Sequence, residues 1–261
     1  MSQEVFKKQD IQVLRVGVGN EARDIAYIAD QGCDRLPGLF WLGGFKSSMM
    51  GLKADALADW SRANNHAFTR MDYSGHGASG GDFIDGTITR WLEEALGIFK
   101  AATKGPQIII GSSMGGWLAL LLAQAMAHEN RIMGIILIAP AWDMSERLMT
   151  ARLSDEAKAA LAKDGFFKRP SAYGDDDYII TKKLIDDGAN HLIGDKKLHL
   201  GCSVHILHGQ SDEDVPWQHG QELMTLLPRD DVSFTLVPDG DHRLSRDEDL
   251  KRLMAAIEAM I

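Results

Sequence analysis

Cysteine is scarce in this 261-residue chain. Cys33 and Cys202 are its two thiols, and no C-x-x-C pair occurs. This argues against a disulfide scaffold and against a cysteine-based zinc site. A chain of this length buries roughly three quarters of its unfolded surface, so it needs no disulfide to fold.

Basic residues are also in the minority. The 28 Lys and Arg against 37 Asp and Glu give a formal net charge of −9. A nucleic-acid-binding surface would be basic, so the balance predicts no nucleic-acid partner. The same sign of charge disfavours strongly anionic substrates.

Long hydrophobic runs are missing. The longest, Ile132–Ala139 and Trp117–Ala127, are too short or too interrupted to span a bilayer. The first eight residues resemble neither a secretory signal nor an Arg-rich transit peptide. With 45% apolar and 25% charged residues, the chain is predicted to form one soluble, cytoplasmic domain over residues 1–261, with no membrane insertion.

What the sequence does have is an alternation of short apolar runs with helix-period segments. Runs such as Ile108–Ile110 and Ile135–Ile138 are apolar at consecutive positions, which is typical of parallel strands covered on both faces. The pattern predicts an α/β fold with a doubly wound, mostly parallel sheet, preceded by an antiparallel hairpin. The expected strands are Ile11–Val16, Ile25–Ala29, Leu39–Leu42, Ala67–Met71, Gln107–Ile110, Ile132–Ile138, Val204–Leu207 and Val232–Val237. The expected helices are Leu52–Ala63, Ile88–Ala102, Met114–His128, Gln218–Leu227 and Asp247–Met260.

Residues 141–201 interrupt this alternation. They contain two helix-like pieces, Glu156–Lys163 and Thr181–Gly188, separated by an expected turn at Phe166–Pro170 and the acidic run Asp175–Asp177. Long insertions in compact domains are usually functional, so we expect a helical cap over one edge of the sheet. The alternative is an ordinary pair of crossover helices with a long loop.

A glycine-rich turn with a central serine follows the strand Gln107–Ile110. Its sequence from Gly111 to Gly116 is Gly-Ser-Ser-Met-Gly-Gly, which matches G-x-S-x-G with Ser113 at the nucleophile position. Ser112 does not qualify, because Ile110 stands where the first glycine would be needed. The helix that begins near Met114 adds positive potential beside the serine. The alternative is a tight turn without chemistry.

A serine nucleophile needs a base and an orienting acid, which in this order of elements follow it along the chain. His242 is the favoured base because its loop follows the last expected strand. His128, His205, His208 and His219 are interpreted as structural, with His208 in a turn, whereas His191 and His199 stay open as substrate contacts. Asp212, Glu213 and Asp214 compete for the acid, since all three follow the strand Val204–Leu207.

Acyl transfer also needs hydrogen-bond donors for the developing oxyanion. The N–H of Met114, the residue after the nucleophile, is one candidate. The N–H of Phe45 is the other, because its loop, Gly43–Lys46, follows the expected strand Leu39–Leu42.

These motifs resemble the α/β-hydrolase superfamily over nearly the whole chain. Gly111–Trp117, Leu207–Gly209 with Asp212 and Val215–Trp217, and Asp241–Arg243 look like the mitochondrial palmitoyl-protein thioesterase and acyl-glucuronide esterase branch. The resemblance implies an eight-stranded α/β-hydrolase fold, a triad of Ser113, Asp212 and His242, and no cofactor. Asp72–Ser79 is similar to the loop after the fourth strand and is interpreted as structural. Gly43 departs from the histidine that many members have there.

The resemblance implies hydrolysis of carboxylic esters or thioesters of small molecules or acylated proteins. The acyl group would lie under the cap against the apolar candidates Trp142, Met144, Leu148, Met149, Phe166 and Phe167. Alternatives on the same fold are a serine peptidase, a carbon–carbon bond hydrolase, or a non-catalytic binding protein. No metal is expected, because an acidic run such as Asp175–Asp177 is usually solvated.

Overall fold

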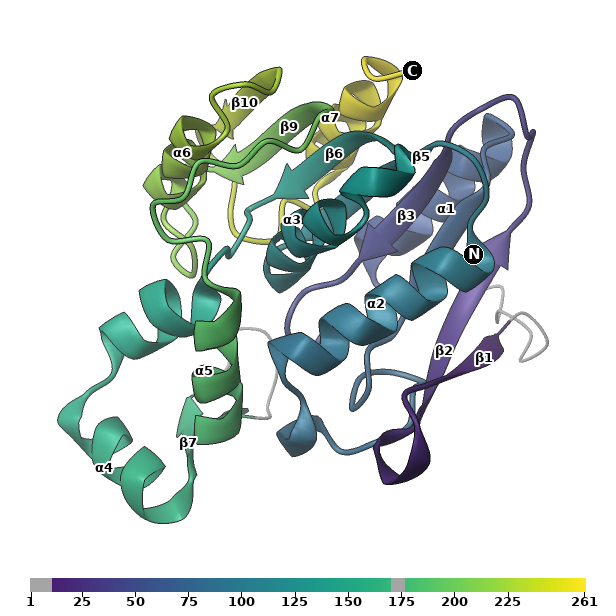
Figure 1. Cartoon of the computed structure of the whole chain (residues 1–261). Helices are drawn as coiled ribbons and strands as arrows, with labels where there is room; N and C mark the ends of the chain where they lie inside the picture. Colours follow the sequence, from purple (N-terminus) through teal and green to yellow (C-terminus); the bar gives the residue numbers. More distant parts are fainter. Residues whose placement is uncertain (1–10, 170–176) are drawn as a thin grey trace.

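The computed structural model describes residues 11–169 and 177–261, and an eight-stranded sheet forms its centre (Figure 1). The strand order is β1-β2-β4-β3-β5-β6-β9-β10. The pairs β1–β2 and β2–β4 are antiparallel, and the other pairs are parallel. The predicted lead-in hairpin and the mostly parallel eight-stranded sheet are thus confirmed. The strands are β1 Gln12–Val16, β2 Arg23–Asp30, β3 Gly38–Leu42, β4 Phe68–Met71, β5 Gln107–Ser112, β6 Ile132–Ile138, β9 Ser203–Gly209 and β10 Val232–Val237.

Helices cover both faces of this sheet. Helices α1 (Leu52–Ala63) and α7 (Asp247–Glu258) pack on one face, whereas α2 (Ile88–Ala102), α3 (Met114–Ala125) and α6 (Trp217–Leu226) pack on the other. In β5, Ile108 and Ile110 belong to the core under α1 and α7, and Ile109 belongs to the core under α2 and α3. The consecutive isoleucines are therefore buried because successive side chains point to opposite, covered faces.

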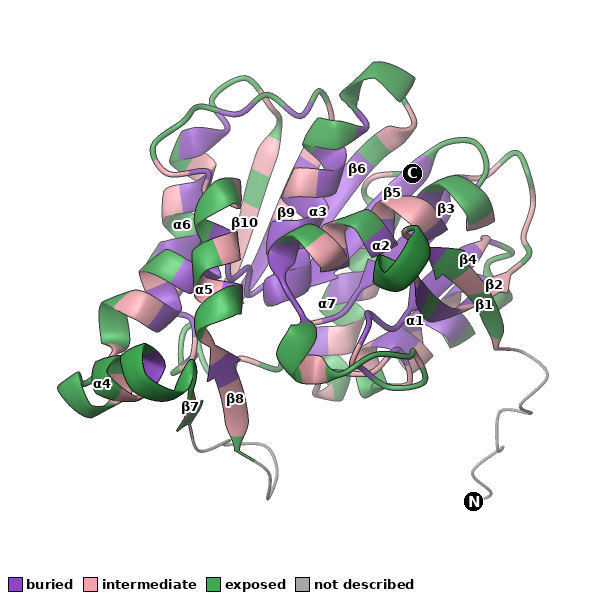
Figure 2. Ribbon diagram, turned by 60° about the horizontal axis from the view of Figure 1, so that its bottom comes forward, coloured by how far each residue is buried: buried purple, intermediate pink, exposed green. Residues whose placement is uncertain are grey.

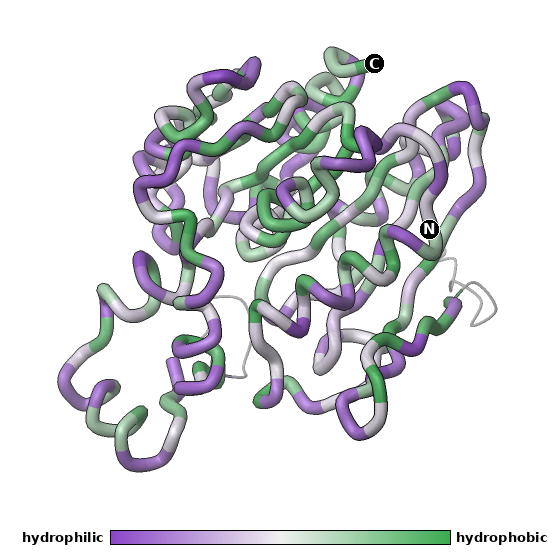
Figure 3. Tube along the Cα trace, viewed as in Figure 1, coloured by the Kyte–Doolittle hydropathy of each residue, from purple (hydrophilic) through white to green (hydrophobic). Residues whose placement is uncertain are grey.

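Helix α2 illustrates how the sequence specifies a helix here. The Thr87 hydroxyl accepts a hydrogen bond from the Arg90 N–H at 3.2 Å and caps the first turn. Buried apolar residues then recur at helical spacing, at Ile88, Trp91, Ala95, Ile98 and Phe99. Hydrophobic and hydrophilic residues accordingly alternate along this helix (Figure 3). Within the described residues, no helix has the length and apolar character needed to cross a membrane.

The segment between β6 and β9 forms a separate group of short elements beside the sheet. It contains a π-helical turn (Met144–Met149), α4 (Asp155–Asp164), β7 (Phe166–Arg169), β8 (Tyr178–Thr181) and α5 (Lys182–Gly188). Residues of α4 are mostly exposed, whereas β8 and α5 are partly buried (Figure 2). The Asp187 carboxylate ties α5 to α2 by accepting hydrogen bonds from the N–H and hydroxyl of Thr89, at 2.8 and 2.7 Å.

One prediction for this segment is wrong. Phe166–Arg169 was expected to form a turn, but it forms strand β7, paired antiparallel with β8. The reason is that Phe166–Arg169 becomes a strand only by pairing with β8, and a short apolar run alone does not predict such a partner. The last residue of the expected turn, Pro170, and the acidic residues Asp175 and Asp176 lie outside the described residues.

Candidate active site

Ser113 occupies the sharp turn between β5 and α3. Its backbone has φ 55° and ψ −119°, a conformation that is costly for any residue with a Cβ. Glycine is required on either side, because a Cβ at Gly111 would collide with the Gly115 carbonyl and a Cβ at Gly115 with the Leu42 carbonyl. The turn thus holds the serine hydroxyl at the carboxyl edge of the parallel strands.

Two loops at the same edge bring a histidine and an aspartate to this serine. The Ser113 hydroxyl and His242 Nε2 are 3.1 Å apart, and His242 Nδ1 lies 2.8 Å from Asp212 Oδ2. The carboxylate can only accept, so His242 carries its proton on Nδ1 and offers the Nε2 lone pair to the serine hydroxyl. Asp212 follows β9 and His242 follows β10, so the sheet sets the spacing of all three.

Asp212 is buried and fixed by further donors. Its Oδ1 accepts the N–H groups of Asp214 and Val215 at 3.0 and 2.8 Å. Burial acts to raise the pKa of Asp212, but the hydrogen bonds from His208, His242 and Val215 outweigh it and lower the pKa to about 2. The carboxylate is therefore ionised at neutral pH. Of the three competing acids, it is Asp212 that contacts His242.

Four other histidines make contacts away from Ser113. His205 bonds Thr235, His219 donates to the Trp142 carbonyl, His199 pairs with Asp230 and His191 bonds Thr89. The expectation of His208 in a turn is wrong, because this residue lies within β9, fully buried, and donates to the Val215 carbonyl at 2.9 Å. It lies in the strand because the pairing of β9 with β10 continues as far as Gly209.

The two predicted oxyanion donors lie on the segments that flank Ser113. Met114 is the first residue of α3, where the backbone N–H groups have no partner within the helix. Gly44 approaches Ser113 so closely that a Cβ added there would lie 3.3 Å from the Ser113 Cβ. Phe45 is the next residue, and both lie in the lining of a cavity that also contains Ser113.

This cavity has a volume of about 690 Å³ and is bounded by His242 and by the segment after β6. Of the predicted acyl contacts, Met144, Leu148 and Met149 line it. Trp142 is instead fully buried and stacked on His219, with ring centroids 4.6 Å apart. Phe166 is 40% exposed and Phe167 packs against the core, and neither lies in the cavity lining. The structure thus places three of the six apolar candidates in the lining of the cavity that contains Ser113.

The charge of the cavity is opposite to that of the whole chain. Its charged lining residues are Lys46, Lys53, Arg169 and Arg243, against Asp55 and Asp214. The net charge of −9 therefore does not describe the surroundings of Ser113.

Tyr178 of β8 is a lining residue that sequence analysis missed. Its ring lies 5.9 Å from the Phe45 ring and 5.7 Å from the Lys46 ammonium, which also donates to the Asp177 carbonyl at 3.1 Å. The segment after β6 thereby contacts the Gly43–Lys46 loop. No signal could have found Tyr178, because the β7–β8 hairpin was not expected. Among the described residues, no three His, Cys, Asp or Glu side chains gather in a way that could hold a metal ion.

Two buried histidines predict how stability depends on pH. Burial lowers the pKa of His76 and of His219 from 6.5 to about 4, against hydrogen bonds to Ser74 and Trp142 that act to raise it. Between pH 6.5 and 4 the unfolded chain binds protons that the folded chain does not, so the free energy of unfolding falls as the pH is lowered through this range. Each histidine contributes up to about 3 kcal/mol to this fall.

Urea unfolding at pH 7, 5.5 and 4.5 measures this effect. We expect the midpoint to decrease steadily toward pH 4.5, and to decrease less steeply in His219→Gln. A midpoint that stays constant over this range would contradict the burial of two neutral imidazoles.

Comparison with known proteins identifies the family of this chain. The family model described as serine aminopeptidase, S33, matches residues 44–169. A mouse protein named palmitoyl-protein thioesterase ABHD10, mitochondrial, is 33% identical over 243 residues, which are 93% of this chain and 80% of that protein.

Two solved structures extend the match to the whole fold. A putative hydrolase from Agrobacterium vitis S4 is 44% identical with a TM-score of 0.93, covering 96% of this chain and 98% of that one. Mouse α/β hydrolase domain-containing protein 10 is 30% identical with a TM-score of 0.83, covering 96% and 97%. The predicted α/β-hydrolase fold is confirmed, and so is the resemblance to the palmitoyl-protein thioesterase branch. The chain belongs to the α/β-hydrolase superfamily, in the branch of the ABHD10 palmitoyl-protein thioesterases.

Proposed function

We propose that the chain is a serine hydrolase that cleaves carboxylic esters and thioesters through Ser113, His242 and Asp212. The observation that carries the proposal is the chain of hydrogen bonds from Ser113, in its strained turn, through His242 to the buried, ionised carboxylate of Asp212. Ester hydrolysis agrees with the name of the mouse thioesterase that matches 93% of the chain.

The reaction proceeds by two acyl transfers. The Ser113 oxygen bonds to the carbonyl carbon while His242 Nε2 takes the hydroxyl proton, and Asp212 stabilises the imidazolium. The oxyanion accepts hydrogen bonds from the N–H groups of Phe45 and Met114. His242 then returns the proton to the departing alcohol or thiol, which leaves an acyl-enzyme. A water molecule attacks the acyl-enzyme with the same base, and the carboxylic acid is released.

The segment 141–201 acts as a cap in this proposal. Met144, Leu148 and Met149 line the cavity beside Ser113, where they offer an apolar surface to an acyl chain. The proposed carboxylic ester and thioester substrates include both small molecules and acylated proteins. Cytoplasmic location stays a prediction for this chain, since the relatives' names place those proteins in mitochondria.

A substrate panel tests the proposal. We expect turnover of p-nitrophenyl esters and acyl thioesters, with a burst of p-nitrophenol equal to the enzyme concentration where the acyl-enzyme accumulates. Aminoacyl amides, the substrates of a peptidase, are expected to react far more slowly. Amide hydrolysis faster than ester hydrolysis would identify a peptidase, and no turnover of any member would favour a binding protein.

A further inference from the structure

We infer that His76 is a positioning residue for the oxyanion hole, because it accepts the N–H of Lys46 and so fixes the loop that carries the Phe45 N–H. The inference rests on the proposed function, in which Phe45 supplies one of the two oxyanion donors. It assigns a role to the Asp72–Ser79 turn beyond the structural one that the sequence predicts.

The first observation is the contact between this turn and the loop. The Lys46 N–H donates to His76 Nε2 at 3.0 Å. Lys46 has φ 58°, a left-handed conformation that a residue with a side chain adopts at a cost. The histidine therefore holds a strained peptide directly after Phe45.

The second observation is that His76 has a fixed tautomer. Its Nδ1 donates to the Ser74 carbonyl at 3.1 Å, so Nε2 carries the lone pair that the Lys46 N–H needs. His76 is 4% exposed, and burial lowers the pKa of its ring to about 4, so it stays a neutral acceptor at neutral pH.

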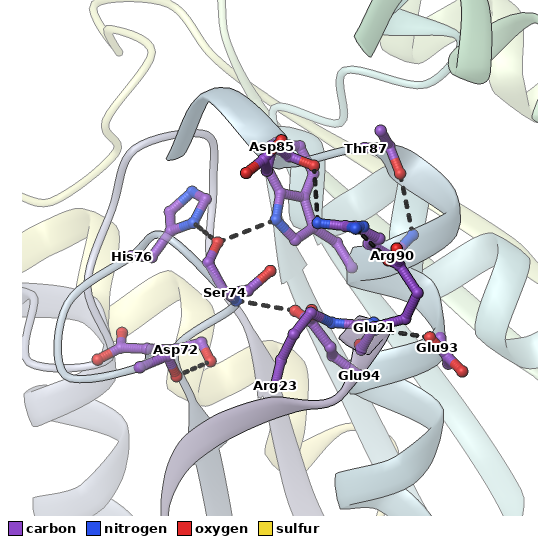
Figure 4. Close-up of polar contacts among 12 residues, drawn as sticks. Glu21, Arg23, Asp72, Ser74, His76, Asp85, Thr87, Arg90, Glu93 and Glu94 are labelled. Carbon is purple, nitrogen blue, oxygen red and sulfur yellow. Dashed lines mark hydrogen bonds and ion pairs between the residues drawn. The ribbon is translucent and has the colours of Figure 1, made fainter. Parts of the chain in front are cut away.

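The third observation is the anchoring of Ser74 itself. Its N–H donates to Glu94 Oε2 at 2.8 Å, and Glu94 pairs with Arg23 at 2.6 Å (Figure 4). Glu94 and Arg23 come from α2 and β2 and are both buried. A buried ion pair in the body of the protein thus anchors Ser74, the residue whose carbonyl orients His76.

Two more contacts hold the segment Gly43–Met49, which continues the Gly43–Lys46 loop, on either side of Lys46. The Asp72 carboxylate accepts the Met49 N–H at 2.6 Å, and the Tyr73 hydroxyl donates to the Gly43 carbonyl at 3.3 Å. The rings of Phe45 and His76 also pack against one phenyl ring, that of Phe83, at centroid distances of 4.9 and 5.1 Å. The loop is therefore held at three points by one turn, and His76 makes the contact nearest to Phe45.

Loss of the acceptor leaves the Lys46 N–H without its partner and frees the peptide next to Phe45. A donor displaced by a fraction of an ångström stabilises the oxyanion less, whereas apolar contacts to the bound substrate are unchanged. The kinetic signature is thus a lower kcat with an unchanged KM.

A pair of variants separates positioning from folding. His76→Asn keeps a donor for the Ser74 carbonyl but has no acceptor at the place of Nε2, whereas the amide oxygen of His76→Gln can reach that place. We expect His76→Asn to lower kcat for a p-nitrophenyl ester by about 10²-fold with KM within about twofold. We expect His76→Gln to restore most of the loss.

His66→Gln is the matched control, because His66 is also buried and donates to one backbone carbonyl, that of Pro37, at 2.8 Å. It precedes β4, away from the carboxyl edge of the sheet, so its kcat is expected to stay at the wild-type value. Affinity for a trifluoromethyl ketone, which forms a tetrahedral adduct with the serine, should fall in His76→Asn by the same factor as kcat/KM. Melting temperatures of all variants exclude global unfolding.

The inference is overturned if His76→Asn keeps wild-type kcat, if His76→Gln is as impaired as His76→Asn, or if ketone affinity is unchanged while kcat falls. The proposed function fails separately, through wild-type turnover in Ser113→Ala. An inactive Ser113→Ala beside a fully active His76→Asn would refute the role of His76 alone.

Discussion

Replacing Ser113 by alanine is expected to lower kcat for a p-nitrophenyl ester by about 10⁶-fold, the usual cost of removing a serine nucleophile. In the proposed reaction, the hydroxyl that faces His242 Nε2 at 3.1 Å forms the covalent bond to the acyl carbon. The remaining donors and the apolar cavity then bind a substrate that they cannot acylate. Initial rates at saturating ester, and loss of labelling by a fluorophosphonate probe, measure the change.

The fold should survive this substitution. Alanine also has a Cβ at φ 55°, so the strain of the turn is unchanged, and the hydroxyl makes no contact needed to close it. Ser112→Ala is the matched control, since this neighbouring serine belongs to β5, whereas His242 Nε2 is hydrogen-bonded to Ser113. We expect Ser112→Ala to be labelled like the wild type. Wild-type turnover in Ser113→Ala at an unchanged melting temperature would refute the assigned nucleophile.

The fold was largely predictable because its strands and helices have strong periodic signals. The helices expected at Leu52–Ala63 and Ile88–Ala102 have those bounds in the structure. Apolar residues at consecutive positions, as at Ile108–Ile110, have few structural solutions other than a strand covered on both faces. The β7–β8 hairpin lacks such a signal. Its strands are four residues each, partly exposed, and depend on pairing with one another.

The residues around the nucleophile were predictable to different degrees. Ser113, Asp212 and His242 each follow a strand of the same sheet. The order of the elements therefore predicts that all three lie at one edge of that sheet. The cavity wall was harder to predict, because an apolar residue in the inserted segment can face the cavity or the core. Met144 faces the cavity, whereas Trp142, two residues earlier, faces the core.

The contact of His76 with the Gly43–Lys46 loop depends on tertiary structure alone. His76 and Lys46 are 30 residues apart, and their bond forms only when the loops after β3 and β4 meet. A glycine-rich motif indicates a turn, but it does not indicate which loop that turn supports.

Replacing Asp212 by asparagine is expected to lower kcat by about 10⁴-fold, the second large effect. The amide can present its NH₂ group to His242 Nδ1, which would then accept instead of donate. The proton would move to Nε2, and the ring would have no lone pair to take the Ser113 proton. The retained amide oxygen can still accept the N–H groups of Asp214 and Val215, so we expect the loop to keep its shape.

Variants at the two neighbouring acids test the specificity of this effect. Glu213 is exposed and Asp214 contributes its backbone N–H to Asp212, so Glu213→Gln and Asp214→Asn are each expected to change kcat by less than about tenfold. A larger loss in Asp214→Asn than in Asp212→Asn would reassign the acid.

The pH dependence of Asp212→Asn tests whether the lost charge at position 212 causes the defect. The pKa of Asp212 is about 2 because the bonds from His208 and His242 outweigh the effect of burial. The carboxylate therefore stays ionised in mild acid, and protonation of Asp212 should not limit wild-type kcat until the pH approaches 2. In Asp212→Asn, by contrast, no pH restores the ionised acceptor for His242 Nδ1, so the defect should persist across the neutral and mildly acidic range. An Asp212→Asn defect that disappears at mildly acidic pH would contradict an orienting carboxylate, because no charge returns to position 212 at any pH.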